Sequence, residues 1–379
     1  MIYPEATGAD LSEAQAEALD DTFLSSDPFA LTKSRVSMMR TWRAHSADSD
    51  SAPGAVQQGT EAPSDVVGEH DLRTAPSDRR SPARIAATQL ALDAFVLRQQ
   101  LAENTVRLAW AALDDSTPQP RCIWLKVSEG PTTVRDVNRM LWDALKIEAT
   151  GQRLADLLLP APEIYLRRDK DDVVSTLDVF ESWLHYASLL LSRSDFYLHG
   201  VYNKTKHGLA VAARDDMRLA ITTAAPTPEG SIRLSDINGP KTTDVIRAPV
   251  IEALHRSPGR RKDNPGLEVS QVQIDIDEVL QECEMVAWVH GALFHGLARE
   301  HFESRGDQVD GLTAPPHPGL YPDGPTPRTD DFGLPTGFRD RITLGGQSLP
   351  ERKTGIAFPG RFVGLNQHGP MQTGQVVDG

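Results

Sequence analysis

Residues 172–209 read DVVSTLDVFESWLHYASLLLSRSDFYLHGVYNKTKHGL, and this stretch decides the fold. Asp171 and Asp172 stand where acidic side chains favour a helix N-terminus. The apolar residues that follow recur at the three- and four-residue spacing of one helix face: Val173, Val174, Leu177, Phe180, Leu184, Ala187, Leu190 and Leu191. The pattern predicts a long amphipathic helix that needs partners to cover its apolar face.

The second half of the stretch predicts a shorter helix, which begins near Asp195 with Ser194 as its N-cap and ends at Gly208. Polar side chains line one edge of this helix: Asp195, His199, Tyr202, Asn203, Lys206 and His207. One interpretation is a surface for acid/base chemistry or nucleic-acid contact, because imidazoles titrate near neutral pH. The other is ordinary capping, because cations such as Lys206 and His207 complement the carbonyl end of a helix.

A family resemblance involves the junction between these two helices, where five residues separate Arg193 from His199. This arrangement resembles the Arg-x(4–6)-His signature of the HEPN family of helical-bundle ribonucleases and nucleic-acid-binding proteins. The resemblance covers about residues 84–210 and implies metal-independent RNA cleavage through Arg193 and His199, often across a dimer interface. Ser194 departs from the Asn, Asp or His that the family often places after the arginine.

The spacing of this motif recurs elsewhere in the chain, in the pairs Arg40–His45 and Arg361–His368. Only its helical setting favours the pair of Arg193 and His199. Six positions on a continuous helix correspond to about 240° of rotation around the axis. The two side chains therefore converge only if Arg193 lies before the start of the second helix.

Net charge, cysteine content and the lack of long apolar runs indicate which classes of protein this sequence fits. The 379 residues carry a formal net charge of −14, which argues against a nucleic-acid footprint over the whole surface but leaves room for a local basic patch. Cys122 and Cys283 lie in separate apolar segments, as expected of buried thiols in a reducing compartment. The N-terminus has no secretory pattern, and no apolar run reaches the roughly 18 residues of a membrane span. We therefore expect a cytoplasmic protein without a membrane partner.

Several common catalytic motifs are missing from the sequence. There is no Gly-x-Ser-x-Gly, His-Glu-x-x-His or Cys-x-x-Cys pattern. His290 and His295 are five positions apart, which is the wrong spacing for two metal ligands on one helix face. Since His290 lies among apolar residues, the pattern favours a core histidine bonded to a neighbour. We expect no cofactor and no metal site.

Composition also divides the chain into an ordered centre with arms. Residues 1–44 form an arm that is first acidic and then basic, and we favour a partly ordered tail over an arm that folds back on itself or docks on a partner. Residues 45–81, rich in Ser, Ala, Asp, Pro and Gly, predict a disordered linker. Residues 306–379 are rich in Pro and Gly and predict a disordered tail.

The ordered centre, 82–305, combines two periodicities. Helical patterns cover 84–113, 132–149 and 275–305 in addition to the opening stretch. Strands are expected at 121–128, 217–223, 231–237 and 267–274, and either a strand or a short helix, broken by Pro249, is expected at 244–254. The predicted fold class is mainly α, a helical bundle with a small antiparallel β insertion at about 217–274, flanked by disordered N- and C-terminal arms. The helix at 275–305 is expected to cover one face of the insertion.

Two functional hypotheses follow from the sequence. The first, which we favour, is a non-catalytic binding or scaffold module whose tails recruit protein partners. The second is a HEPN-like metal-independent ribonuclease or RNA-binding protein that acts through Arg193 and His199. RNA, protein partners and a second copy of the chain are thus the candidate partners.

Overall fold

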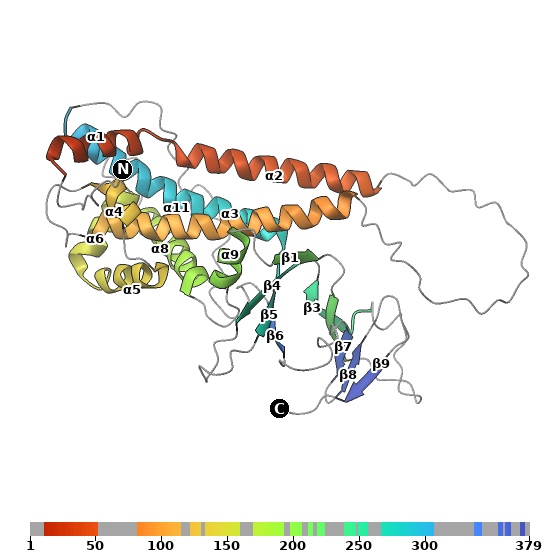
Figure 1. Cartoon of the computed structure of the whole chain (residues 1–379). Helices are drawn as coiled ribbons and strands as arrows, with labels where there is room; N and C mark the ends of the chain where they lie inside the picture. The colour runs from red at the N-terminus through yellow and green to blue at the C-terminus, as the bar shows by residue number, and fades with distance from the viewer. Residues whose placement is uncertain are drawn as a thin grey trace, which may run out of the picture.

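A computed structural model describes the greater part of the chain (Figure 1). The described residues are 11–51, 82–114, 122–129, 133–159, 170–192, 198–206, 211–214, 218–223, 239–247, 249–256, 267–306, 337–342, 355–358, 361–364 and 372–375. The predicted class, a mainly α-helical bundle with a small antiparallel β insertion, is confirmed.

The helices of the described ranges are α1 (Glu13–Leu24), α2 (Pro28–Ser51), α3 (Pro82–Leu113), α4 (Ile123–Glu129), α5 (Val134–Ala144), α6 (Glu148–Leu158), α8 (Lys170–Ser192), α9 (Leu198–Lys206) and α11 (Ile276–Glu303). The two longest, α3 and α11, lie side by side and form the most extensive helix–helix contact (Figure 1). Helices α2, α5 and α8 pack around this pair. Among these helices, none is long and apolar enough to cross a bilayer.

The core runs along α3, which is contacted by other helices on several sides. Its Phe95, Val106 and Ala109 have no exposed surface. From α8, the predicted apolar face is buried around Phe180 and Leu184, as the opening stretch of sequence required. Most of the buried apolar side chains among the described residues form one continuous cluster. The bundle is therefore held together mainly by apolar burial.

The N-terminal arm is more ordered than we predicted, because both of its helices dock on the bundle. On α2, Phe29 and Val36 are buried against the core. Arg40 pairs with Glu284 of α11 at 2.6 Å, and Arg43 Nη2 lies 2.6 Å from a carboxylate oxygen of Asp277, also on α11. The basic segment of the arm therefore finds its acidic partners on α11, within the same chain.

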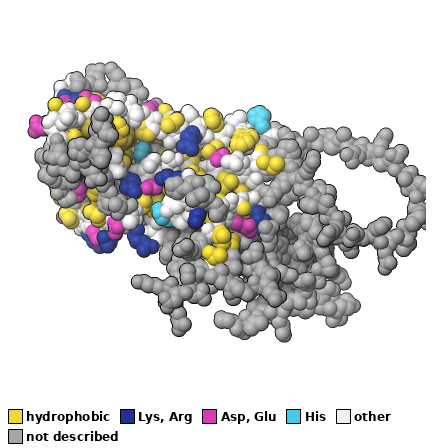
Figure 2. Space-filling view, viewed as in Figure 1, with side chains coloured by type: hydrophobic (Ala, Val, Ile, Leu, Met, Phe, Trp, Pro, Cys, Tyr) yellow, Lys and Arg dark blue, Asp and Glu magenta, His cyan; other side chains and the backbone are white. Residues whose placement is uncertain are grey.

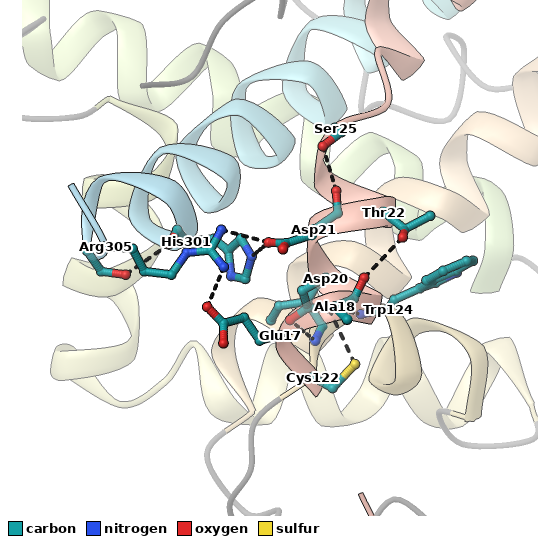
Figure 3. Close-up of polar contacts among 12 residues, drawn as sticks. Glu17, Ala18, Asp20, Asp21, Thr22, Ser25, Cys122, Trp124, His301 and Arg305 are labelled. Atoms are coloured by element: carbon teal, nitrogen blue, oxygen red, sulfur yellow. Dashed lines mark hydrogen bonds and ion pairs between the residues drawn. The ribbon is translucent and has the colours of Figure 1, made fainter. Parts of the chain in front are cut away.

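The segment predicted as a strand at 121–128 is instead helix α4, so that prediction is wrong. Its β-branched and aromatic residues favoured a strand, but a carboxylate from α1 caps the helix (Figure 3). The Asp20 side chain accepts hydrogen bonds from the backbone N–H groups of Ile123 and Trp124, each at 2.9 Å. Because Asp20 lies about a hundred residues earlier, local sequence could not reveal this N-cap.

A second contact anchors the other side of α1 to the end of α11 (Figure 3). Asp21 Oδ1 lies 2.7 Å from His301 Nε2 and 2.7 Å from Arg305 Nη2, and Glu17 also pairs with Arg305. Hydrogen bonds from Arg305 and His301 lower the pKa of Asp21. Helix α1 is therefore fixed at two points, on α4 and on α11.

The strands are β1 (Val211–Arg214), β2 (Arg218–Thr222), β3 (Thr242–Arg247), β4 (Val250–Arg256), β5 (Leu267–Gln273), β6 (Gly337–Ile342), β7 (Gly355–Phe358), β8 (Arg361–Gly364) and β9 (Gln372–Gln375). They form a four-stranded antiparallel sheet in the order β1-β4-β5-β6 and a five-stranded sheet in the order β3-β2-β7-β8-β9. In the second sheet, β2 and β7 are parallel. The predicted strand at 231–237 lies outside the described residues.

Two details of the sheets differ from the prediction. We predicted that α11 would cover one face of the β insertion. The main helix contacts of β1 and β4 are instead with α3 and α9. Strands β6 to β9 belong to the segment that we predicted to be a disordered C-terminal tail. Strand β6 pairs with β5 and strand β7 pairs with β2, because edge strands offer free backbone groups for pairing. The remainder of the predicted linker and tail lies outside the described residues.

Candidate functional site

Helix α9 carries most of the predicted site. Leu198, Val201 and Tyr202 are buried at the three- and four-residue spacing of one face, which packs on α3 and α8. This packing turns His199, Asn203 and Lys206 toward the outside of the bundle. Three other predicted site residues, Arg193, Asp195 and His207, lie outside the described residues.

His199 is the central side chain of the described part of the site. Its Nε2 lies 3.1 Å from the side-chain nitrogen of Asn203, so the amide donates to an unprotonated Nε2. Nδ1 is buried and has no hydrogen-bond partner among the described residues. Burial lowers the pKa of His199 from its ordinary value of 6.5. The lowered pKa favours the neutral imidazole, and the amide N–H of Asn203 favours the tautomer with its proton on Nδ1.

Helix α3 contributes two charged residues that we did not predict. Glu103 accepts from Arg107 Nε at 3.0 Å, four positions along the same helix. Glu103 favours the protonated form of His199, whereas Arg107 opposes it. An i,i+4 Glu–Arg pair is common on helix surfaces, so nothing in the sequence marked this pair as part of a site.

Tyr202 and Lys206 are coupled on the same turn of α9. The Lys206 ammonium lies 5.7 Å from the centre of the Tyr202 ring, within reach of a cation–π contact. Burial, followed by the charge of Glu103, raises the pKa of Tyr202 to about 12. Tyr202 therefore acts as a buried support, while Lys206 is exposed to solvent.

Helix α5 adds a further cation, Arg135, which is exposed and lowers the pKa of His199 through its charge. Several Lys and Arg side chains are visible over this part of the bundle (Figure 2). We name the convergent side chains the α9 cluster: Glu103, Arg107, Arg135, His199, Tyr202, Asn203 and Lys206. It is a locally cationic surface on a chain whose formal net charge is −14.

Other titratable residues fall into structural positions. His290 stacks on Phe294 of the same helix with 6.2 Å between ring centres, and burial lowers its pKa to about 4. Cys122 and Cys283 are both buried free thiols. Within the described ranges, no three His, Cys, Asp or Glu side chains gather as a metal-binding group.

The chemistry of the α9 cluster suits an anionic ligand. It combines two exposed cations, Lys206 and Arg135, with the amide of Asn203 and a neutral imidazole. Cations attract phosphate groups, and the exposed amide of Asn203 can both donate and accept hydrogen bonds with a ligand. Comparison with protein-family models, with curated proteins and with solved structures found no match to this chain.

Proposed function

We propose that this protein is a helical binding module and that the α9 cluster contacts a phosphate-bearing chain, with single-stranded RNA as the ligand class. The observation that carries the proposal is that charged side chains of α3, α5 and α9 all lie near enough to His199 for their charges to act on its pKa. Lys206 and Arg135 provide exposed positive charge, and the nearby Glu103 is already paired with Arg107.

Single-stranded RNA suits this surface for electrostatic reasons. Each phosphate that a Lys or Arg neutralises releases a condensed counterion, which drives binding at low salt. The 2′-hydroxyl of RNA both donates and accepts hydrogen bonds, as does the pair of Asn203 and His199. Tyr202 is buried, so base stacking on this ring does not enter the proposal.

Fluorescence anisotropy with a labelled single-stranded RNA of about 20 nucleotides, in chelator and over a range of salt, tests the binding. Each phosphate contact contributes about −0.7 to the slope of log K against log salt. We therefore expect Lys206→Gln and Arg135→Gln each to flatten that slope by about this amount. Lys146→Gln is the matched control, because Lys146 is exposed and pairs with Asp143 at 2.6 Å.

The binding proposal fails if the unmodified protein does not bind the RNA. It also fails if Lys146→Gln flattens the slope as much as Lys206→Gln does, because the contact would then be spread over the surface.

A second candidate function is metal-independent RNA cleavage of the HEPN type through Arg193 and His199. The observation that favours it is the lowered pKa of His199. A neutral imidazole accepts a proton at pH 7, as a general base must. In this interpretation Nε2 accepts the proton after the RNA displaces the Asn203 amide from it, and Glu103 stabilises the imidazolium that forms.

Incubation of the protein with labelled RNA in chelator, followed by gel analysis, separates the two functions. A pure binding module leaves the RNA intact. Cleavage that is lost in both His199→Ala and Arg193→Ala supports the second candidate. If His199→Ala cleaves as fast as the unmodified protein, the catalytic proposal is wrong.

A further inference from the structure

The imidazole of His199 has one position at which it can gain a proton, the Nε2 atom that faces Asn203. The tautomer favoured by the Asn203 amide already carries a proton on Nδ1, and Nδ1 is buried. The added proton of the imidazolium therefore resides on Nε2. Since Nδ1 keeps its proton in both states, the change in hydrogen bonding occurs at the contact with Asn203.

Asn203 cannot keep its present hydrogen bond once Nε2 is protonated. In the structure the amide nitrogen of Asn203 lies 3.1 Å from Nε2 and donates to it. Two N–H groups cannot bond to each other, whereas the Oδ1 atom of the same amide accepts from a protonated Nε2. Rotation of the amide by about 180° exchanges its oxygen and its nitrogen. Asn203 is exposed on α9, so this rotation requires little movement of its neighbours.

The rotation reverses the hydrogen-bonding character that Asn203 presents to a ligand. Beside a neutral imidazole, the amide nitrogen is engaged and the oxygen, an acceptor, is directed away from the ring. Beside an imidazolium, the oxygen is engaged and the NH₂ group, a donor, is directed away from the ring. The oxygens of a phosphodiester only accept hydrogen bonds, so the second arrangement suits an RNA backbone and the first does not.

The charges that act on His199 come from three helices. Glu103 of α3 favours the imidazolium, and Lys206 of α9, Arg135 of α5 and Arg107 of α3 oppose it. Lys206 and Arg135 are also the cations that we propose to contact phosphate. Because a bound phosphate offsets their positive charge, they oppose protonation of His199 less strongly when the ligand is present.

The other elements packed on α9 contribute titratable groups that have partners elsewhere. His185 of α8 contacts the ring of Trp142 with 5.2 Å between ring centres, and Tyr186 of α8 donates to a core carboxylate. Arg214 of β1 and Glu252 of β4 pair with each other at 3.1 Å. Among the described residues, the four charges on α3, α5 and α9 therefore have the largest influence on the protonation of His199.

We propose that His199 and Asn203 form a pH-dependent switch in the α9 cluster: protonation of His199 turns the NH₂ group of Asn203 toward the ligand, and the site then binds phosphate more tightly. The inference rests on the proposed function, because it describes how that same site is regulated. Protonation adds one positive charge and replaces an acceptor with a donor. Both changes favour an RNA phosphate as the pH falls.

Fluorescence anisotropy with the full-length protein and a labelled oligouridylate tests the switch. The window from about pH 8 to about pH 5.5 covers the ordinary titration range of histidine. Neither the phosphodiesters nor the uracil bases titrate in this window. We expect binding to be about three- to tenfold tighter at the lower pH, as expected for one charge-assisted hydrogen bond.

Three variants show whether the gain in affinity depends on this pair. His199→Gln keeps an amide but cannot titrate, so we expect its affinity to change less than about twofold across the window. Asn203→Leu keeps the imidazole but removes the amide, and the gain should fall by at least about half. His185→Gln is the matched control, because His185 is exposed on α8 and is not among the charges that act on His199; it should keep the full gain. Circular dichroism at both pH values checks that each variant keeps its helix content.

NMR titration of the free protein tests the same contact without RNA. The side-chain amide signals of Asn203 should shift with the same midpoint as the imidazole signals of His199, because the two side chains exchange donor and acceptor roles together. Amide signals that stay constant while His199 titrates would overturn the switch.

The binding experiment separates failure of the switch from failure of the proposed function. Equal RNA affinity at both pH values overturns the switch and leaves the binding proposal intact. A full gain that survives in His199→Gln assigns the proton to another residue and also overturns the switch. If the protein binds no RNA at either pH, the proposed function itself is wrong.

Discussion

Two clusters around α3 contain the same three residue types in different surroundings. In the core, the Arg98 guanidinium donates to Glu282 at 2.8 Å, and the Tyr186 hydroxyl donates to the other oxygen of that carboxylate. At the surface, the α9 cluster contains Arg107, Glu103 and Tyr202. The side chains of Arg98 and Glu282 are 2% and 9% exposed, against 19% and 16% for Arg107 and Glu103.

The difference in burial separates a structural cluster from a candidate binding site. Arg98, Glu282 and Tyr186 come from α3, α11 and α8, so they connect three helices of the bundle. Burial also raises the pKa of Tyr186, which therefore stays protonated. The α9 cluster lies where Lys206 and Arg135 reach solvent. Similar side chains thus connect helices in the core in one place and lie beside the exposed cations Lys206 and Arg135 in the other.

The strongest test of this comparison removes one carboxylate from each cluster. Glu282→Gln leaves Arg98 as an unpaired charge in the core, and we expect the free energy of unfolding to fall by about 3–5 kcal/mol. Glu103→Gln, the matched change at the surface, should cost about 1 kcal/mol or less. Urea denaturation followed by circular dichroism measures both values. Equal losses in the two variants would remove the distinction between the clusters.

Two glycines differ in how closely neighbouring atoms pack around them, as the two clusters differ in burial. A Cβ atom on Gly296 of α11 would lie 2.4 Å from the backbone oxygen of Leu157 on α6, whereas a Cβ atom on Gly151 of α6 would meet nothing within 4 Å. We expect Gly296→Ala to lower the free energy of unfolding by about 1–3 kcal/mol, because the two helices must separate. Gly151→Ala should stabilise the protein by about 0.5–1 kcal/mol. Thermal unfolding of both variants tests this, and a stable Gly296→Ala protein would contradict the close packing.

Two neighbouring carboxylates on α1, Asp20 and Asp21, also differ in burial (Figure 3). Asp20 is buried and caps α4, while Asp21 is more exposed and pairs with Arg305. We expect Asp20→Ala to cost about 1–2 kcal/mol, because two N–H groups of α4 lose their acceptor. Asp21→Ala should cost less than about 1 kcal/mol. Chemical denaturation separates the two values, and the reverse order would exclude the proposed capping role.

The smallest effects concern the titration of His199. Burial lowers its pKa in the folded protein, so the unfolded chain takes up a proton first as the pH falls below about 6.5. Folded stability from this residue is therefore present above that pH and declines as the pH drops toward the folded pKa. NMR titration of the imidazole should show a midpoint below 6.5. Lys206→Gln should raise that midpoint and Glu103→Gln should lower it further.

If neither substitution moves the midpoint, these side chains do not share one electrostatic site with His199. Lys146→Gln serves as the control, because Lys146 pairs with Asp143 and is not among the charges that act on His199.

Much of the helical framework was predictable because it depends on local periodicity. The patterns at 84–113 and 275–305 match α3 and α11 to within about two residues at each end. Asp275 caps α11 by accepting from the N–H groups of Asp277 and Glu278, as its acidic first turn indicated. Such features are encoded within a few residues of where they act.

The candidate site was predictable only in part. The sequence nominated His199, Tyr202, Asn203 and Lys206 because they share one short helix, and the structure keeps them together there. It did not nominate Glu103, Arg107 or Arg135, which lie on other helices. An ion pair on one helix does not indicate which helix packs beside it, so periodicity carried no signal for these residues.

The amino-acid sequence by itself determined the helical class, the amphipathic faces of α8 and α11, and the polar stripe on α9. Each of these depends on side chains that repeat along a single helix. Only the tertiary structure decided that α4 is a helix, that the N-terminal arm docks, and that α3 and α5 complete the α9 cluster. Those outcomes depend on contacts such as Asp20 with Ile123 and Arg40 with Glu284, which join residues about 100 to 240 positions apart. Such contacts form only when the helices pack together, so the pattern of a short segment cannot predict them.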